Sequence, residues 1–583
     1  MNKDFYVFSL TNYNTAQDYL TLLPIINDEA FLRQFCTQID LVYNYSERLN
    51  VLAKFGIERI LANRFTDLDI ENPLNITDSD HPLFDDYNDY EPSFKARHQN
   101  INQYGFGLDY KDLTKNIESI GRQLSSIEMK NNKICALVLP NGIDMAISFL
   151  ALTNYVTVSP LNPNYTKDEF LFFLEDLDCE FIITDNNASN ALIEAAKQLE
   201  IKLFCIDNVT PKTELLIKQV PLSSICSVDE NKGNDFCLIL HTSGTTSRPK
   251  QVQLSCTNII SSALNISSVL KLEQSDKGLN IMPLFHIHGL IASLLSSIIT
   301  GASLVCTNGF NALTFYGNIK NFKPTWITAV PTMYQAILSR ASRNKEIIED
   351  ADLRLLRSSS AAMPIATIEA LENVFQCPVI EAYGMTEASH QMASNFLDSI
   401  RKAGSVGKSA GPEIAIFKDD KLTTLANTVG EIVIKGTNVT KGYKNNKRAN
   451  KDNFFNGWFK TGDLGKFDED GFLFISGRIK EIINKGGEKI SPQEVDEALM
   501  KHDAVFQAVC FSVKHEKLGE DIASAVVLKE GLTVDEKELK AHLSKSIATF
   551  KIPRQILILN EIPKGNTGKI QRIGLAKKLG LEQ

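Results

Sequence analysis

From about residue 108 onward, short apolar segments alternate with helical patterns, and this alternation limits the folds that the chain can adopt. Residues 134–142 (ICALVLPNG) and 181–184 (FIIT) are typical of buried strands, and residues 145–156 between them are typical of a buried helix. Helices that alternate with Val-, Ile- and Leu-rich strands predict an α/β fold with a mostly parallel, helix-covered sheet. In such sheets ligands bind at the carboxyl ends of the strands, so functional residues are expected directly after strands.

The length of 583 residues predicts more than one domain, because a single hydrophobic core does not grow to this size. Near the C-terminus, residues 504–513, 522–529 and 555–560 have strand patterns around a predicted helix at 535–547. They predict a small α+β domain of about one hundred residues, which is a common domain size.

The first 90 residues differ from the rest of the chain. Apolar residues at helical spacing within 30–42 and 49–61 predict two or three amphipathic helices. From Asp67 to Glu91 there are nine acidic residues and no Lys or Arg, which is typical of a linker or a loosely packed segment. We interpret this part as a solvated connector. An acidic docking segment is the alternative, and the sequence does not identify its partner.

Composition argues against several classes of protein. The formal net charge of −9 argues against a nucleic-acid partner, because nucleic-acid binding usually requires a basic face. The ten cysteines include no CxxC pair, so a disulfide framework or a zinc site is not expected, and a reducing, cytoplasmic location is expected. The first residues, MNKDFYVFSLTNYN, lack the apolar core of a signal peptide, and the final Leu-Glu-Gln is not a peroxisomal signal.

One apolar stretch, residues 289–306, approaches the length of a membrane span. It contains several serines and is interrupted by Gly301. We therefore expect a buried helix followed by a buried strand at 303–307, and no transmembrane segment.

A loop rich in glycine and hydroxyl residues follows a predicted strand at residues 236–240, and residues 240–250 read LHTSGTTSRPK. Glycine between small hydroxyl residues lets the backbone approach a phosphate closely, and Arg248 and Lys250 add positive charge. The pattern is not a Walker A motif, and an ordinary Ser/Thr-rich turn is the alternative. The residues that would hold phosphate are Thr242, Ser243, Gly244, Thr245, Thr246 and Lys250.

Two later segments also place small or polar residues after a strand. Residues 353–364 (LRLLRSSSAAMP) end a predicted strand in serines and alanines, which again permits close backbone approach. Residues 379–390 (VIEAYGMTEASH) place an acid, Glu387, after an aromatic residue, a glycine and a threonine. A carboxylate beside a phosphate loop suits Mg²⁺, since this ion binds carboxylate and phosphate oxygens.

Two histidines and an aspartate are further candidates. His286 and His288, in the segment MPLFHIHGL, are expected in a loop; a structural pair is the alternative, and no third ligand is near enough in the sequence for a zinc site. Asp463, in WFKTGDLG, is expected in a Gly-flanked turn, where its carboxylate can accept both hydroxyls of a ribose. The alternative is a turn aspartate that caps its own backbone.

Together these segments resemble the adenylate-forming enzymes, the family of acyl-CoA synthetases, adenylation domains and luciferases. The phosphate loop, YGMTE, the ribose segment and the terminal IPKGNTGKIQR occur in the family's order within residues 100–575. The resemblance implies an α/β fold with a large N-terminal adenylating domain over 91–478 and a small, mobile α+β C-terminal domain over 479–583. An N-terminal extension over 1–90 precedes them, and the implied hinge between the two domains is Lys480.

The resemblance also implies ATP and coenzyme A as co-substrates and Mg²⁺ as the metal. It assigns the phosphate loop and Thr386 to the phosphates, with Thr245 among the catalytic residues, and Glu387 to the metal. Lys569, in the terminal motif, is the implied catalytic lysine. The other implied contacts are Tyr383 at the adenine, Gly384 beside it among the ATP-binding residues, Ser360, Ala361 and Ala362 in a second nucleotide loop, Asp463 and Arg478 at the ribose, and Gly486 and Gly487 on the pantetheine path.

Within the family, the segments look most like the oxalate–CoA ligase branch. This implies ATP-dependent adenylation of a small carboxylate, with oxalate as the best candidate, and its transfer to coenzyme A. A second carboxylate buried in the pocket needs hydrogen-bond donors or positive charge, which His288, Ser359 and His390 can supply. Gln251, where the branch usually has glycine, and the first 90 residues depart from the branch pattern. Two alternatives stay open: an acyl-AMP ligase that loads another acid onto coenzyme A or a carrier protein, and a nucleotide-binding pseudoenzyme that acts as a scaffold.

Overall fold

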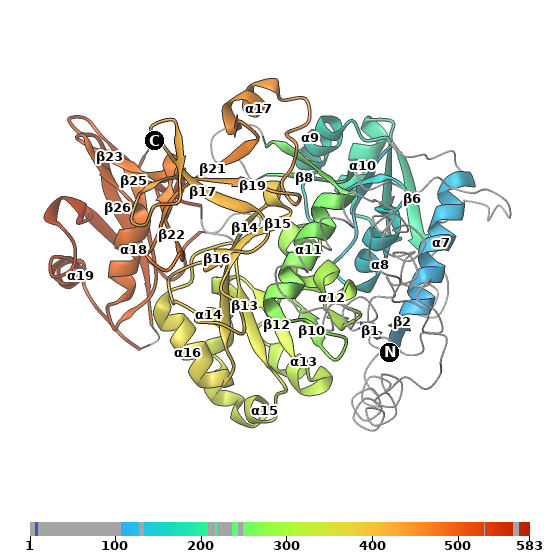
Figure 1. Cartoon of the computed structure of the whole chain (residues 1–583), viewed down its shortest axis with the longest axis horizontal. Helices are drawn as coiled ribbons and strands as arrows, with labels where there is room; N and C mark the ends of the chain where they lie inside the picture. Colours follow the sequence, from blue (N-terminus) through green and yellow to red (C-terminus); the bar gives the residue numbers. More distant parts are fainter. Residues whose placement is uncertain are drawn as a thin grey trace, which may run out of the picture.

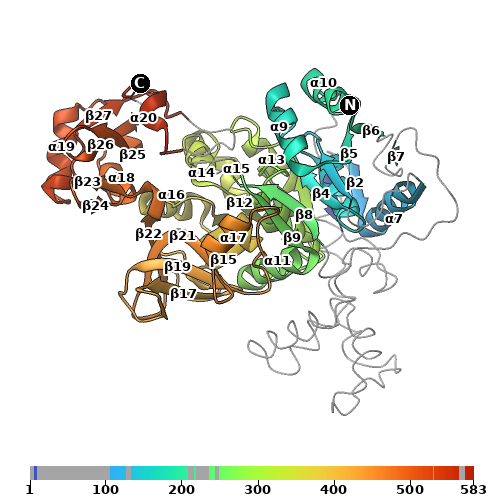
Figure 2. The same cartoon turned by 90° about the horizontal axis from the view of Figure 1, so that it is seen from above.

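The computed structural model describes residues 6–9, 106–126, 133–207, 216–217, 236–242, 249–529, 531–563 and 571–582. The strands within these residues form four sheets. Two views of the molecule, related by a 90° turn, both place the C-terminal sheet and helix α7 (Tyr110–Ser126) at opposite ends (Figures 1 and 2).

The first sheet has nine strands in the order β16-β15-β14-β13-β12-β10-β11-β1-β2. The neighbouring strands from β14 to β11 are parallel, as the sequence predicted. The strands are β16 (Lys408–Ser409), β15 (His390–Ser394), β14 (Val379–Met385), β13 (Leu355–Ser358), β12 (Trp326–Ala329), β10 (Lys277–Asn280), β11 (Ser303–Cys306), β1 (Tyr6–Ser9) and β2 (Phe106–Asp109). Strand β1 was not predicted, and the helices predicted within residues 1–90 lie outside the described residues.

The second sheet has seven strands in the order β7-β6-β5-β3-β4-β8-β9. The strands from β6 to β8 are parallel, and β7 and β9 are antiparallel to their neighbours. The strands are β7 (Leu216–Ile217), β6 (Lys202–Asp207), β5 (Phe181–Thr184), β3 (Ile134–Leu137), β4 (Thr157–Pro160), β8 (Phe236–His241) and β9 (Gln251–Ser255). The predicted strand at 181–184 is confirmed as β5.

Helices cover the two large sheets, and α11 (Cys256–Leu270) contacts β15 of the first sheet and β8 and β9 of the second (Figure 1). The others near the second sheet are α8 (Ile143–Leu152), α9 (Lys167–Leu177) and α10 (Asn190–Gln198). Those near the first sheet are α13 (Phe315–Phe322), α14 (Pro331–Leu338), η4 (Ala341–Arg343), α15 (Lys345–Glu349), α16 (Ile365–Phe375) and η5 (Thr386–Ala388).

The apolar stretch at 289–306 forms a buried helix followed by a strand, as predicted. A π-helical segment, η3 (His288–Leu295), continues into α12 (Ser296–Ile298) and then into β11. No helix in the described part of the chain is long and apolar enough to cross a membrane. The cysteines within that part are all free thiols, and the cytoplasmic location stays a prediction.

The third sheet is antiparallel, in the order β18-β17-β19-β21-β20 with β22 also paired to β21. Its strands are β17 (Glu413–Lys418), β18 (Lys421–Thr423), β19 (Gly430–Lys435), β20 (Phe454–Phe455), β21 (Trp458–Phe467) and β22 (Leu473–Arg478), and α17 (Lys447–Asn453) precedes β20. The sheet ends at Arg478, beside the short helix η6 (Ile479–Glu481).

The fourth sheet corresponds to the small α+β region predicted near the C-terminus. Its strands are β24 (Glu488–Ile490), β23 (Ile483–Lys485), β26 (Gly519–Leu528), β25 (Val505–His515) and β27 (Gln555–Ile558). Helices α18 (Pro492–Met500), α19 (Glu536–Leu543), η7 (Thr549–Lys551) and α20 (Leu575–Lys578) accompany it. The proposed domain boundary at 478 falls between the third and fourth sheets, and it stays a prediction.

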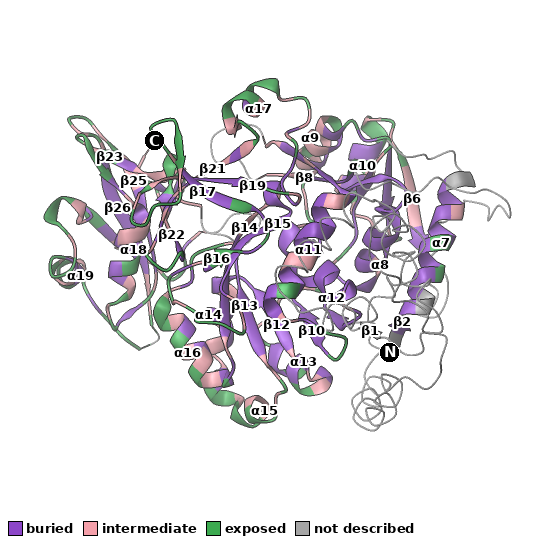
Figure 3. Cartoon of the chain, viewed as in Figure 1, coloured by how far each residue is buried: buried purple, intermediate pink, exposed green. Residues whose placement is uncertain are grey.

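Burial follows the layered arrangement. The central strands of both large sheets are buried, whereas exposed residues gather on outer helices such as α15, α16 and α19 (Figure 3). Strands covered on both sides have no solvent-facing side, so a charged residue within one of them needs a specific reason. β13 contains such a residue, Arg357, which is fully buried.

Candidate active site

The phosphate loop connects the antiparallel strands β8 and β9. Thr242 and Lys250 close its two ends, since the backbone N–H of Thr242 donates to the carbonyl of Lys250 at 2.9 Å. Residues 243–248 are outside the part of the chain that the structure describes. The predicted phosphate contacts of Ser243, Gly244, Thr245 and Thr246 therefore have no structural description.

Asp176 at the end of α9 holds both strands at the base of this loop. Its Oδ2 lies 3.0 Å from Nε2 of His241 and accepts from Nε2 of Gln251 at 2.8 Å. The Gln251 amide also donates to the Asp176 carbonyl. Burial lowers the pKa of His241, which favours the neutral ring. Local sequence patterns did not indicate this contact, because Asp176 is far from both partners along the chain.

Glu387 lies in η5, directly after β14, and its carboxylate is buried. It accepts a hydrogen bond from the Tyr443 hydroxyl at 2.8 Å, and Nζ of Lys250 lies 4.4 Å from the centroid of the Tyr443 ring. Burial raises the pKa of Glu387, and the positive charge of Lys250 partly opposes this effect. The structure thus brings the predicted metal ligand and a predicted phosphate contact together around one tyrosine.

The carboxylate of Glu387 suits a Mg²⁺ ion that is bound together with a nucleotide. Within the described residues, no group of three or more His, Cys, Asp or Glu side chains is arranged to hold a metal ion. Mg²⁺ is commonly held by one or two carboxylates together with substrate phosphates and water. Glu387 supplies one such carboxylate beside the phosphate loop.

Asp463 lies within strand β21, so the prediction of a Gly-flanked turn was wrong. Pairing with β22 extends the strand through this segment, with Gly462 at φ 75° and a register shift after Leu464. Asp463 faces Arg478 across the two strands, and its Oδ1 lies 3.0 Å from Nε of Arg478.

The other oxygen of Asp463 accepts from the hydroxyl of Tyr383, which is in β14. Burial raises the pKa of Asp463, and Arg478 opposes the shift. Burial and the neighbouring Asp463 raise the pKa of Tyr383, so this phenol keeps its proton. The three predicted adenine and ribose residues therefore form one connected group.

His288, Ser360 and His390 form a second group, with His390 on β15, the strand that pairs with β14. The loop expected for His288 was wrong. This residue begins η3, because the helix starts earlier than its apolar pattern indicated. Its Nδ1 lies 3.0 Å from Oγ of Ser360, and its ring packs edge-on against that of His390 at 4.8 Å between centroids. Ser359 is buried, and its hydroxyl donates to the carbonyl of Ala382 at 2.9 Å.

Arg357 is the residue that the sequence reading missed. Its guanidinium donates from Nη1 to Oγ1 of Thr328 at 3.2 Å and from Nη2 to Oε1 of Gln391 at 3.0 Å. Nη2 also lies 3.5 Å from Nδ1 of His390. The available signal was the string LRLLRSSS, in which a charged residue ends a strand expected to be apolar throughout.

The backbone around these buried side chains contains uncommon conformations. Ser360, Ser389 and His390 have φ of 73°, 50° and 96°, in the region that only glycine adopts readily. A Cβ on Gly384 would lie 1.8 Å from the carbonyl oxygen of His390, so this glycine allows β14 and β15 to approach closely. Such conformations persist where the surrounding structure fixes them, and they gather at functional sites.

The remaining predicted contacts lie at the edges of the site. Ala361 and Ala362 are exposed after Ser360, and Thr386 begins η5. Gly486 and Gly487 form the tight turn between β23 and β24 with φ of 61° and 101°, which explains both glycines without a ligand. Lys480 is in η6. Lys569 falls within 564–570, which the structure does not describe.

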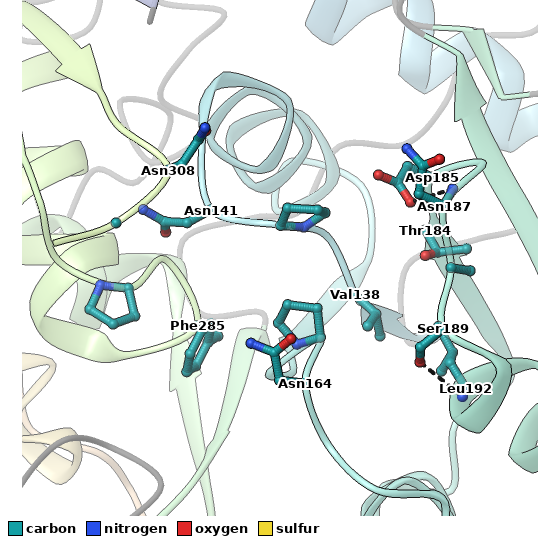
Figure 4. Close-up of a pocket in the computed structure, with 15 residues that line it drawn as sticks. Val138, Asn141, Asn164, Thr184, Asp185, Asn187, Ser189, Leu192, Phe285 and Asn308 are labelled. Carbon is teal, nitrogen blue, oxygen red and sulfur yellow. Dashed lines mark hydrogen bonds between the residues drawn. The ribbon is translucent and has the colours of Figure 1, made fainter. Parts of the chain in front are cut away.

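A pocket of about 370 Å³ lies apart from these residues, between the two large sheets (Figure 4). It is lined by segments that follow β3 and β5 and by segments around Phe285 and Asn308. Asn141 connects its walls, because its amide donates to the carbonyl of Thr307 at 2.9 Å and accepts from the N–H of Leu284 at 2.7 Å. It includes none of the predicted site residues.

Comparison with known proteins gives a consistent result. The model of the AMP-binding enzyme family matches residues 93–444, and that of the AMP-binding enzyme C-terminal domain matches residues 494–569. The chain is 44% identical to an oxalate–CoA ligase of Arabidopsis thaliana, over 80% of this chain and 92% of that protein. It is 39% identical to an oxalate–CoA ligase of Saccharomyces cerevisiae, over 76% of this chain and 86% of that protein.

A solved structure is also similar, that of o-succinylbenzoate coenzyme A synthetase from Bacillus subtilis in complex with ATP and magnesium ion. It superposes with a TM-score of 0.69 at 30% identity, over 80% of this chain and 94% of that one.

Proposed function

The chain belongs to the AMP-binding enzyme family and is an AMP-forming acid–CoA ligase, and we propose that the acid it activates is a small dicarboxylate, with oxalate as the best candidate. The observation that carries the proposal is the buried polar cluster of His288, His390 and Arg357 beside Ser360. A long-chain acid needs an apolar wall along its path, and buried imidazole and guanidinium groups there would be costly to desolvate. The two relatives named as oxalate–CoA ligases are consistent with this substrate class.

The first half-reaction joins the acid to AMP. A carboxylate oxygen attacks the α-phosphorus of ATP, and the bond from this phosphorus to the pyrophosphate oxygen breaks. The protein forms no covalent bond and acts by positioning the reactants and by neutralising charge on phosphorus. We assign Lys250 and the loop from Thr242 to Thr246 to the phosphates that leave, and Lys569 to the region between the acid and the α-phosphate.

Two groups of residues orient the nucleotide in this proposal. Glu387 holds Mg²⁺, which when bound neutralises phosphate charge, and Tyr443 fixes the carboxylate by its hydrogen bond. Asp463 is kept in place by Tyr383 and Arg478. A carboxylate has about four acceptor positions, so Asp463 still has positions left for the ribose hydroxyls.

The second half-reaction releases the product. The thiolate of coenzyme A attacks the acyl carbon, and the bond from this carbon to the AMP oxygen breaks. We propose that the C-terminal domain turns about Lys480 between the two steps, which withdraws Lys569 and brings Gly486 and Gly487 to the thiol path. Rotation about one or two residues between packed domains is a common form of domain movement.

Acid-dependent exchange of pyrophosphate into ATP tests the proposal. The panel would contain oxalate, malonate, acetate and a long fatty acid, and Lys569→Ala would be the control. We expect exchange with oxalate that the variant loses, followed by thioester formation on coenzyme A. Exchange with malonate alone would keep the small-dicarboxylate class and remove only the assignment of oxalate. Exchange with acetate or the fatty acid alone would leave the ligase class intact and remove the small-dicarboxylate assignment. ATP binding without exchange for any acid would favour the pseudoenzyme alternative, and an acyl product on a carrier protein alone would favour the carrier alternative.

A further inference from the structure

We propose that Arg357 determines which acid binds beside His288 and His390. It fixes the tautomers of these two histidines and supplies the positive charge that selects an acid with a second carboxylate. The inference rests on the proposed function and deepens it. Arg357 is at the end of β13, between the strands that carry Thr328 and Ala382, and its side chain is fully buried.

The guanidinium has only neutral partners. They are a threonine hydroxyl, a glutamine amide oxygen and an imidazole nitrogen. Within the described residues, no Asp or Glu forms an ion pair with Arg357, and its buried Nε has no hydrogen-bond acceptor. A buried charge without a counter-charge is strongly unfavourable. An anionic ligand beside this group would therefore be stabilised more than a neutral one of the same shape.

Arg357 fixes the proton of His288 through Thr328. A guanidinium can only donate, so Oγ1 of Thr328 is an acceptor toward Arg357. The same oxygen lies 2.6 Å from Nε2 of His288. Thr328 is fully buried and has no other hydrogen-bond partner among the described residues, so its own proton is donated to this nitrogen. His288 consequently carries its proton on Nδ1.

The hydrogen bonds continue from His288 to a partly exposed hydroxyl. Nδ1–H of His288 donates to Oγ of Ser360 at 3.0 Å. Ser360 is half-buried, next to the exposed Ala361, and as an acceptor from His288 it keeps its own hydroxyl proton for an acid. The chain of donation therefore runs from a buried positive charge to a hydroxyl that a substrate can reach, and a charged donor strengthens such a chain.

His390 receives the second branch of this arrangement. Because Nη2 of Arg357 can only donate, Nδ1 of His390 is the acceptor in their contact of 3.5 Å. The proton of the neutral His390 ring is then on Nε2, which is a donor. Both histidines thus remain neutral donors beside one fixed cation. Burial lowers the pKa of Arg357 to about 9, and the group stays charged at neutral pH.

Arg357→Met in the full chain tests the inference, with kcat and KM measured for oxalate and for acetate, a monocarboxylate of equal carbon number. We expect kcat/KM for oxalate to fall on the order of a hundredfold, mainly through KM, and kcat/KM for acetate to change little. Arg357→Lys, which keeps the charge, should recover part of the oxalate activity. Equal losses for both acids, or no loss for oxalate, would overturn the inference and leave Arg357 a purely structural residue.

Two further variants cover the case in which Arg357→Met does not fold. Thr328→Val keeps the side-chain shape and removes the link to His288, so it should raise KM for oxalate about tenfold and spare acetate; an unchanged ratio of the two acids would count against the inference. Arg354→Met is the matched control on the same segment, since Arg354 pairs with Asp276 at 2.5 Å away from the pocket. It should lower the melting temperature without changing that ratio.

The wild-type measurements separate the two proposals. Wild-type turnover of oxalate with an unchanged acid ratio in Arg357→Met would overturn the role of Arg357 alone. Wild-type turnover of monocarboxylates only would overturn the proposed function and this inference together.

Discussion

Two clusters have residues on β14 or on the strands that pair with it, and they differ in how their buried charges are balanced. The nucleotide cluster contains Lys250, Tyr383, Glu387, Tyr443, Asp463 and Arg478. The acid cluster contains His288, Thr328, Arg357, Ser360 and His390. In the nucleotide cluster both carboxylates have cations nearby, Arg478 against Asp463 and Lys250 close to Glu387. In the acid cluster the cation has only neutral partners within the described residues.

The difference in charge balance indicates what kind of ligand each cluster binds. In the nucleotide cluster, burial raises the pKa of both acids and neighbouring cations oppose the shift, so charge is largely compensated within the protein. In the acid cluster, burial lowers the pKa of Arg357 and no acid of the described chain compensates its charge. A compensated cluster orients a ligand that brings its own metal, whereas an uncompensated one selects a ligand of opposite charge.

The largest effect is expected for Glu387→Gln, which removes the only charge of the nucleotide cluster that is assigned to Mg²⁺. We expect the rate of adenylate formation to fall by about a hundredfold to a thousandfold, because the amide is a poor magnesium ligand while its shape is nearly unchanged. Pyrophosphate exchange at saturating ATP and varied Mg²⁺ measures this loss. High Mg²⁺ should restore only part of the rate.

Tyr443→Phe is the matched control for this prediction. It removes the hydrogen bond to Glu387 and keeps the ring beneath Lys250. The loss should be about tenfold, as is typical when the partner of a metal ligand is removed. A loss as large as that of Glu387→Gln would instead give Tyr443 a role of its own.

The nucleotide cluster was largely predictable from the sequence, and the acid cluster was not. Segments such as YGMTEA and TGDLG keep their functional residues close together in the chain, so local strings were sufficient to find Glu387 and Asp463. Even there the turn expected for Asp463 was wrong, because pairing between β21 and β22 determined the backbone. Whether a segment that contains glycine continues a strand depends on its pairing partner, which the local pattern does not include.

The side-chain partners of Arg357 come from two separate strands, β12 and β15. Thr328 is 29 residues before it in the chain, and Gln391 is 34 residues after it. A charged residue at the end of an apolar strand was visible in the sequence, but its lack of a counter-charge depends on which side chains surround it. Strand β1 was also missed, although Tyr6, Val7 and Phe8 favour a strand, because its partners β11 and β2 are far away along the chain.

Glu381 tests directly whether the charge of Arg357 is compensated within the protein. Glu381 is buried on β14 and pairs in register with Ser358, the residue after Arg357, and burial raises its pKa to about 7. Its carboxylate accepts from the N–H of Gly404 at 3.0 Å and forms no ion pair within the described residues. If Glu381 compensated Arg357, its pKa would be lowered instead.

The sign of the pH dependence separates these cases. An unfolded glutamate has a pKa near 4.3, so between pH ~4 and ~7 the folded protein holds a proton that the unfolded chain has lost. Stability should therefore fall as the pH rises through this window, by up to about 3 kcal/mol. Glu381→Gln should melt like the wild type at pH ~5 and at a higher temperature at pH ~8. A variant that is less stable at pH ~8 would show that Arg357 has an anion in the protein after all.

The smallest effect is expected at the base of the phosphate loop, where Gln251→Met removes the hydrogen bonds to Asp176 and leaves the His241 contact in place. One or two hydrogen bonds to a partly buried group contribute about 1 kcal/mol, so KM for ATP should rise about fivefold. The value of kcat should change little, because the variant does not alter any group of the acid cluster.

Gln253→Met is the control: Gln253 lies two residues further along the same strand, and its side chain has no hydrogen-bond partner among the described residues. Initial rates at varied ATP measure both variants. Equal KM values for the two would show that Asp176 does not hold the loop in place. A fall in oxalate affinity with Gln251→Met would show that the two clusters are coupled through β14, against the independence that their separate charge balance implies.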